Sequence, residues 1–342
     1  MNLVTGGSGF IGINIVRELM NRGEGVRVID VAPLDADLVD RGVEYLNIDI
    51  RDKEKVIAAC AGINHIYHII SLVPISKAGR VFWEVNVEGT RNLLEGALKY
   101  GVKKIVHMSS SAVYDIDQKH PLREDSPIKP LGVYAHSKYD AENVCQEFVK
   151  KGLDITIVRP RTVVGAGRLG VYQILFDWLR RGKKIYIMGR GDNRIQFIHV
   201  KDLVEAMILM AKKSSPEIFN IGTGTFGTLR QDLQALIDYA RTGSKIVSLP
   251  SRITVFLLKL LDKVNLSPLA DWHYLSYHKD FYFDISKAKN IITWRPRYSN
   301  IEMLVESYQW YLQHFREVDD QLGTTHRKSV RQGLLKILRK IS

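Results

Sequence analysis

Cysteine is scarce in this sequence, with Cys60 and Cys145 the only two among 342 residues. Both lie in stretches of helical character, and neither has the spacing of metal ligands. We therefore expect no disulfide framework and no zinc or other metal site. So few cysteines are typical of the reducing cytosol, and the expected location is cytoplasmic.

Long apolar runs are also missing. Residues 253–264 form the longest strongly apolar stretch, but Lys259 and Asp262 interrupt it, and it is far shorter than the roughly 20 residues of a membrane-spanning helix. The first residues run directly into a glycine turn, which leaves no room for a secretory signal. With 45% apolar and 25% charged residues and no internal repeat, the composition excludes disordered and fibrous chains.

Acidic residues are absent from residues 321–342, which carry six basic residues and so half of the net charge of +12. If residues 327–341 are helical, the basic side chains lie mainly opposite one apolar face. This pattern is typical of an interfacial helix on anionic lipid, and we predict peripheral binding to the inner membrane face. Contact with a dimer partner or with the protein's own body is the alternative. Nucleic acid is not an expected partner, because the tail has no aromatic residues to stack on bases. The apolar face would comprise Val330, Leu334, Leu335, Leu338 and Ile341.

Short apolar segments alternate with helical patterns through the first half of the chain. This alternation predicts an α/β fold, a Rossmann-type doubly wound parallel sheet with helices on both faces. The strands lack strict polar alternation, as expected where both faces of a sheet are covered. Strands are expected at residues 3–4, 26–30, 43–48, 65–71, 104–109 and 155–158, and helices at 12–22, 53–61, 86–100 and 137–150.

After Arg159-Pro160 the pattern changes to a smaller mixed α/β lobe. Helices are expected at residues 172–181, 201–211 and 230–241, with short strands at 184–188 and 217–221. We divide the chain into a Rossmann domain at residues 1–160 with a return near 195–205, a C-terminal substrate lobe at 161–315, and a linker with the basic amphipathic tail at 316–342.

Glycines at positions 6, 9 and 12 separate the first strand from the first helix. A dinucleotide needs a tight turn, a backbone that can approach its pyrophosphate, and helix N–H groups facing that anion. Asp30 ends the second strand, eighteen residues after Gly12, where a carboxylate can accept both ribose hydroxyls. The alternative for the glycines alone is an ordinary turn, but together with Asp30 they predict a dinucleotide site.

Asp30 also favours NAD over NADP. A 2′-phosphate would be repelled by the carboxylate, and the next residues, Val31-Ala32-Pro33, supply no basic side chain. Asp49 and Ile50 follow the third strand, where the adenine edge would lie. A helix cap is the alternative for Asp49.

Tyr134 and Lys138 are four residues apart at a helix start and therefore share a face. A phenol of ordinary pKa near 10 is a poor base, but an ammonium one turn away and a nicotinium ring both favour the phenolate. Upstream, the strand at 104–109 ends in Ser109-Ser110-Ser111, and a serine hydroxyl there can hold a substrate oxygen. A solvated helix face is the alternative for the Tyr and Lys pair alone.

The sequence at this point resembles the extended short-chain dehydrogenase/reductase superfamily, of the NAD-dependent epimerase/dehydratase type. The resemblance covers roughly residues 1–315. Its motifs are Thr5-Gly6-Gly7-Ser8-Gly9-Phe10-Ile11-Gly12, Asn86-Val87-Glu88-Gly89-Thr90, Ser109 to Tyr114, Tyr134 to Lys138, Arg159-Pro160 and Phe197 to Asp202.

This resemblance implies a Rossmann domain that holds NAD, a C-terminal substrate lobe and a homodimer. It implies Tyr134 as the base, Lys138 as the residue that orients the ribose and lowers the Tyr134 pKa, and Ser110 as the residue that binds the reacting oxygen. Ser110 is chosen because the family's Ser or Thr lies four residues before the motif's Tyr, here Tyr114. The cofactor contacts we predict are Gly6, Gly9, Phe10, Ile11, Gly12, Asp30, Asp49, Ile50, Ile70, Tyr134, Lys138 and Pro160. The substrate contacts we predict are Ser111, Arg161, Thr162, Arg168, Arg194 and His199.

Family members that dehydrate or decarboxylate sugars commonly carry acidic residues after that Ser or Thr, where this chain has Ser111 and Ala112. Without a carboxylate there, dehydration lacks its general acid. We therefore expect an NAD-dependent epimerase that inverts a secondary-alcohol centre, C4 being the expected position, of a nucleotide-linked or lipid-linked sugar through a transient ketone. Sugar-nucleotide members usually clamp the diphosphate with two arginines that this chain lacks at the usual positions. Arg161 and Arg168 are candidates to replace them, with solvent-facing loop charges as the alternative.

Two other functions stay open at this point. A 3β-hydroxysteroid or sterol-type dehydrogenase acting on a lipid alcohol would share the Tyr and Lys, and residues 253–261 would then line its pocket or touch lipid, although a core helix is the favoured interpretation of that stretch. A non-catalytic NAD-sensing protein is the third hypothesis, and the intact Ser110, Tyr134 and Lys138 argue against it.

Overall fold

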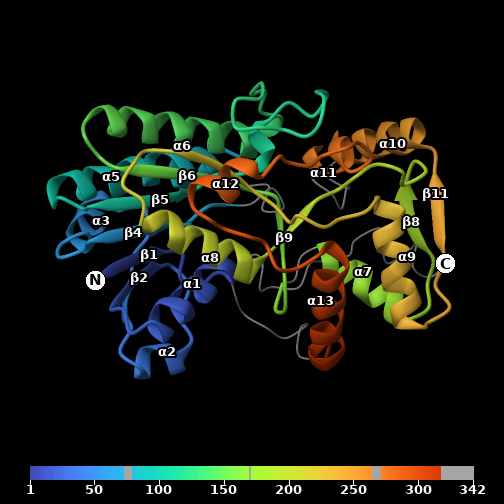
Figure 1. Ribbon diagram of the computed structural model, residues 1–342, viewed down its shortest axis with the longest axis horizontal. Helices are drawn as coiled ribbons and strands as arrows, with labels where there is room; N and C mark the ends of the chain where they lie inside the picture. Colours follow the sequence, from blue (N-terminus) through green and yellow to red (C-terminus); the bar gives the residue numbers. More distant parts are fainter. Residues whose placement is uncertain (73–78, 169–170, 264–270, 317–342) are drawn as a thin grey trace.

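The computed structural model describes residues 1–72, 79–168, 171–263 and 271–316 (Figure 1). It contains a seven-stranded sheet in the order β10-β6-β5-β4-β1-β2-β3, in which every pairing is parallel. The predicted fold class is thereby confirmed. The strands are β1 (Asn2–Thr5), β2 (Val26–Asp30), β3 (Glu44–Asn47), β4 (His65–His68), β5 (Lys104–Met108), β6 (Ile155–Pro160) and β10 (Ile218–Ile221).

Helices cover both faces of this sheet. α1 (Phe10–Asn21) and α8 (Val200–Ala211) pack together on one face, and α3 (Lys53–Ala59), α5 (Gly89–Lys99) and α6 (Gly132–Lys150) form the layer on the other (Figure 1). Each layer has its own apolar core, with Val28 and Leu19 in the first and Leu3 and Ile105 in the second. Because both faces are buried, the strands are almost continuously apolar.

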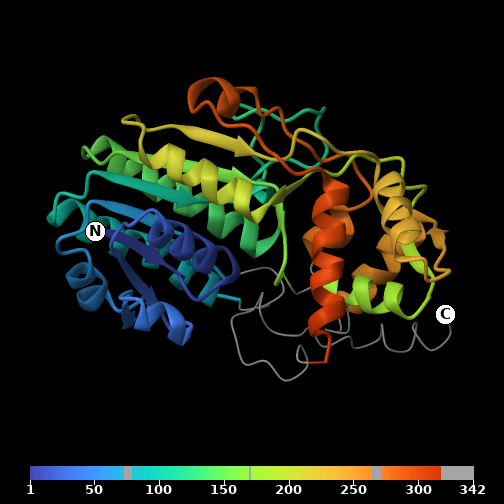
Figure 2. The ribbon, with the colours of Figure 1, turned by 60° about the horizontal axis from the view of Figure 1, so that its bottom comes forward.

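A smaller assembly follows β6, and Figure 2 shows α13 (Asn300–His314) standing at its border with the large sheet. Two short parallel pairs belong to this part, β7 (Thr162–Val164) with β9 (Phe197–His199) and β8 (Ile185–Met188) with β11 (Ile246–Leu249). α7 (Val171–Arg180), α9 (Leu229–Ala240) and α13 enclose a third apolar core, in which Phe176 contacts Tyr308. The remaining helices are α2 (Ala36–Asp40), α4 (Val81–Trp83), α10 (Ser251–Lys263), α11 (Asp271–Ser276) and α12 (Ser286–Ile291).

Two sequence expectations need correction. The strand predicted at residues 217–221 does not belong to the smaller lobe, because β10 pairs with β6 at the edge of the large sheet. The helix predicted from residue 137 begins at Gly132, whose φ of +78° reverses the chain before it, so Tyr134 already lies in the first helical turn. From residue 317 onward, the predicted linker and basic tail lie outside the described residues.

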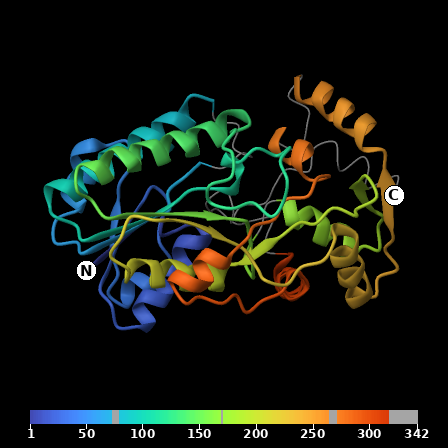
Figure 3. The same ribbon diagram turned by 45° about the horizontal axis from the view of Figure 1, so that its top comes forward.

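α10 is the largest departure from the expected core. Ile253, Phe256, Leu257 and Leu260 repeat at helical spacing along one face and are 60%, 60%, 52% and 46% exposed. Figure 3 shows α10 at the outer edge of the smaller assembly. The favoured interpretation of this stretch as a buried helix is therefore wrong, and we call these four side chains the α10 stripe. Among the residues that the structure describes, no helix combines the length and apolar character needed to span a bilayer.

Candidate active site

The turn after β1 is closed so tightly that only glycine fits it. Gly6 has a φ of +75°, and a Cβ built on Gly12 would lie 2.0 Å from the Gly6 carbonyl oxygen. A Cβ on Gly7 would lie 2.5 Å from Val28 Cγ1. α1 begins directly after Gly9 without a side-chain cap. The first N–H groups of α1 are therefore available to an anion at the edge of the sheet.

Asp30 is fixed beside this turn. Its Oδ2 accepts a hydrogen bond from Ser8 N at 3.1 Å, and its Oδ1 accepts one from Ala32 N at 3.0 Å. Burial raises the pKa of Asp30, backbone N–H groups oppose that shift, and no basic side chain contributes to it. The carboxylate is thus held in place by the backbone without a cation, which fits a neutral ribose diol and disfavours an added phosphate.

The other residues predicted to contact the cofactor already contact parts of the protein. Asp49 forms an ion pair with Arg51 at 2.6 Å, and Asp52, not Asp49, caps α3, so the helix-cap alternative for Asp49 is wrong. Ile50 is buried under Gly89, where an added Cβ would lie 2.7 Å from Ile50 Cγ2. Ile70 lies over the glycine turn, 3.1 Å from a Cβ built on Gly6, and Pro160 ends β6.

Ser110, Tyr134 and Lys138 meet where β5 ends and α6 begins. The Ser110 side chain accepts a hydrogen bond from Ala112 N and lies close enough to Tyr134 to lower the pKa of that phenol. Lys138 follows one helical turn later, is 1% exposed, and donates from Nζ to the Met108 carbonyl oxygen at 2.7 Å. Burial lowers the pKa of Lys138 to about 8.

The pKa of Tyr134 is subject to opposing effects. Burial raises its pKa, while the hydrogen bond with Ser110 and the positive charge of Arg168 lower it. The predicted electrostatic partner was Lys138, but its ammonium is engaged by the Met108 carbonyl, and Arg168 is the cation that acts on Tyr134 in this structure.

Arg161 and Arg168 add two positive charges near Ser110 and Tyr134. Arg161 donates from Nη1 to Ser111 Oγ at 2.8 Å and from Nε to the Gln196 carbonyl oxygen at 3.2 Å. Arg168 lies over the Phe10 ring at 5.4 Å, and its Nε and Nη1 are buried without a hydrogen-bond partner. Burial lowers the pKa of Arg161 to about 9 and that of Arg168 to about 10, so both remain charged at neutral pH.

The remaining predicted substrate contacts are engaged elsewhere or lie at the rim. Arg194 is exposed, with its guanidinium 4.7 Å from the rings of both Phe226 and Tyr282. His199 is fully buried, with Nε2 paired with Glu306 at 2.5 Å and Nδ1 accepting from Lys201 N. Thr162 is half-buried at the start of β7.

Sequence reasoning missed four side chains near this site. Tyr172 and Tyr277 both act on the pKa of the two arginines. These tyrosines are 105 residues apart in the chain. His68 and His107 pair in register on β4 and β5, and burial together with the Lys138 charge lowers the pKa of both. The sequence did contain a signal for this pair, because each of two neighbouring predicted strands carries a histidine near its carboxyl end.

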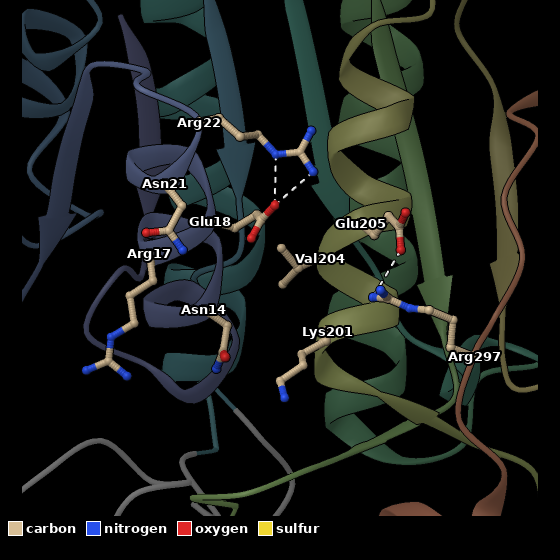
Figure 4. A pocket seen from close by; sticks show the side chains of 9 residues that line it. All are labelled: Asn14, Arg17, Glu18, Asn21, Arg22, Lys201, Val204, Glu205 and Arg297. Carbon is tan, nitrogen blue, oxygen red and sulfur yellow. Dashed lines mark hydrogen bonds and ion pairs between the residues drawn. The ribbon is translucent and has the colours of Figure 1, made fainter.

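A polar groove lies between α1 and α8 (Figure 4), and each of its four cations has an acidic partner. Arg22 bonds Glu18 at 2.8 Å, and Arg297 bonds Glu205 at 3.1 Å. No cluster of three or more potential metal ligands occurs within residues 1–72, 79–168, 171–263 and 271–316. The group around Ser110 and Tyr134 is therefore the stronger candidate site.

Residues 2–222 match the family model described as NAD dependent epimerase/dehydratase family. The chain belongs to this family. The family predicted from the motifs and the NAD cofactor are thereby confirmed, and this epimerase/dehydratase-family protein is an NAD-dependent enzyme. The closed glycine turn, the uncapped α1 and the backbone-held Asp30 fit NAD, whose pyrophosphate and ribose they would hold.

Relatives of this epimerase/dehydratase-family protein act on different compounds. It is 40% identical to uncharacterized protein y4nG of Sinorhizobium fredii over 98% of this chain and 85% of that protein. It is 30% identical to sterol demethylase protein B of Methylococcus capsulatus over 77% of this chain and 81% of that protein. The crystal structure of UDP-glucose 4-epimerase with UDP-glucose from Thermotoga maritima matches with a TM-score of 0.77 at 27% identity, covering 92% of this chain and all of that one.

We expect NAD to bind at least tenfold more tightly than NADP, a difference of about 1.4 kcal/mol. The reason is that Asp30 carries a negative charge and that no basic side chain of the described residues acts on it. Asp30→Ala should narrow the ratio of the two dissociation constants, measured by calorimetry. Asp49→Ala is the control, because both cofactors share the adenine that Asp49 would contact. Equal affinities in the unaltered protein would contradict this assignment.

Proposed function

We propose that this enzyme is an NAD-dependent epimerase that inverts a secondary-alcohol centre, C4, of a nucleotide-linked or lipid-linked sugar through a transient ketone. The observation that carries the proposal is the Ser110, Tyr134 and Lys138 group at the end of β5, with no carboxylate at positions 111 and 112. The fold likeness to a UDP-glucose 4-epimerase supports it.

In this proposal, Ser110 Oγ and Tyr134 Oη bind the same substrate hydroxyl, since Ser110 lies close enough to Tyr134 to lower its pKa. Tyr134 takes the hydroxyl proton and returns it after the ketone has turned over. NAD, when bound, supplies reversible hydride transfer. Lys138, held by the Met108 carbonyl, would release that contact to bind the ribose.

Dehydration is disfavoured by what surrounds Ser110. The hydroxyl of Ser111 is bound by Arg161, and Ala112 is buried and apolar. Neither can protonate a leaving hydroxyl, so the chemistry at this site is limited to hydride and proton exchange at one carbon.

A lipid alcohol is the second candidate substrate, and the α10 stripe favours it. The stripe places four large apolar side chains in solvent, with Arg252 and Lys259 exposed on the same helix. Apolar and basic side chains together are typical of a helix that lies on anionic lipid. We therefore propose that this cytoplasmic enzyme rests on the inner membrane face through the α10 stripe and the basic C-terminal tail. We also propose that it is a homodimer, as the family resemblance implies. The sterol-named relative is consistent with this alternative.

Changing Tyr134 to Phe should lower turnover of UDP-glucose by ~10² or more, because the ring remains but the proton acceptor is lost. NAD affinity should stay within about twofold in calorimetry, a shift of at most ~0.4 kcal/mol. Tyr139→Phe, five residues further along α6, is the matched control and should keep its activity. If Tyr134→Phe turns over at the normal rate, Tyr134 is not the base. If unaltered protein oxidises a 3β-hydroxysterol and leaves UDP-glucose unchanged, the second candidate replaces the first.

Membrane binding predicts sedimentation with vesicles that contain phosphatidylserine. Replacing Phe256 and Leu257 by Ser, or deleting residues 327–342, should each reduce the bound fraction, and raising the salt should do so in part, since exposed charges are screened over ~10 Å at 0.1 M. Replacing the exposed Val133 by Ser on α6 is the control. Protein that stays in solution at low salt would rule out this surface role.

A further inference from the structure

Arg161 and Arg168 lie near Ser110 and Tyr134 with most of their donors unused, and Arg161 is buried while Arg168 is half-buried. Arg161 is 3% exposed, and its bonds to Ser111 and Gln196 use two of its five N–H groups. Arg168 has Nε and Nη1 buried with no partner. A guanidinium whose donors are shielded from water and left unbonded is costly, so a ligand that accepts from them is expected.

No carboxylate of the protein fills this role in the part of the chain that the structure describes. The groups that act on the charges of Arg161 and Arg168 are the hydroxyls of Tyr172, Tyr277 and, for Arg168, Tyr134. The internal segments 73–78, 169–170 and 264–270 contain no Asp or Glu. The buried Arg159 shows the contrast, because Glu142 meets it with two hydrogen bonds of 2.9 and 2.6 Å.

Aromatic rings hold both guanidinium groups in position. Arg161 lies over Phe281 at 4.3 Å and over Phe283 at 5.6 Å, while Arg168 lies over Phe10 at 5.4 Å. A guanidinium over an aromatic ring is stabilised by the ring face and can still donate its unused N–H groups to an anion. Carboxylate and phosphate oxygens are the acceptors that match this edge.

We propose that Arg161 and Arg168 form a binding site for a negatively charged group of the substrate, a carboxylate or a phosphate, next to the alcohol that Tyr134 deprotonates. This proposal rests on the proposed function, because it takes the residues around Tyr134 as the place where the substrate binds. It deepens that function by requiring the substrate to be an acidic alcohol. A neutral sterol would leave both cations without an acceptor.

Anion binding can be measured without turnover, so its failure is distinct from a failure of the epimerase assignment. NAD-loaded protein is titrated with inorganic phosphate and, separately, with 3-hydroxybutyrate, and the thermal unfolding midpoint is followed. At least one anion should raise the midpoint, because a ligand that binds only the folded state stabilises it. Stabilisation by phosphate alone identifies a phosphate group in the substrate, and stabilisation by 3-hydroxybutyrate identifies a carboxylate.

Arg161→Gln and Arg168→Gln should each lower the affinity for the stabilising anion at least tenfold. Tyr134→Phe and the surface variant Arg22→Gln should leave that affinity unchanged. Neutral 1,3-butanediol, tested on unaltered protein, should give no matching shift, and this comparison holds even if an arginine variant fails to fold. The proposal is overturned if neither anion stabilises the loaded protein or if stabilisation survives in both variants. It is also overturned if Arg168→Gln lowers the affinity for NAD tenfold while the anions do not change the unfolding midpoint, because Arg168 would then bind the cofactor.

Discussion

Burial of positive charge without a carboxylate partner is the constraint on which the rest of this site depends. Lys138, Arg161 and Arg168 lie near Ser110 and Tyr134, and burial lowers the pKa of all three without neutralising them at pH 7. Arg159, buried nearby, has Glu142 as its partner and so serves the fold. Arg168 instead favours negative charge on the phenolate of Tyr134, and Arg161 and Arg168 together favour a bound anion.

The parallel sheet determines where these groups meet. The glycine turn follows β1, Asp30 ends β2, Ser110 follows β5, and Arg161 follows β6. Carboxyl ends of parallel strands share one edge of the sheet, so residues far apart in sequence converge there without specific long-range bonds. The smaller assembly then contributes Tyr172 from α7 and Tyr277 from the segment after α11, and both act on Arg161 and Arg168.

Features that depend on a few consecutive residues could be predicted from the sequence. The glycine turn, Asp30 and the Tyr134 to Lys138 spacing are of this kind, and so are most strands of the sheet. Features that depend on distant partners could not. His199 is paired with Glu306, 107 residues away, and Arg168, not Lys138, acts on the charge of Tyr134. The α10 stripe was missed for the same reason, because an apolar helical pattern does not reveal whether another element covers it.

The fate of the hydrogen on the reacting carbon tests the account most directly. UDP-glucose carrying deuterium at C4 is converted by the unaltered enzyme in ordinary water, and the product is examined by NMR. The account predicts an inverted C4 that retains its deuterium, because the same hydrogen leaves and returns within the closed pocket. Deuterium found in released NADH would mean net oxidation, and deuterium lost to water would mean proton abstraction from carbon. Either result would contradict epimerisation by reversible hydride transfer.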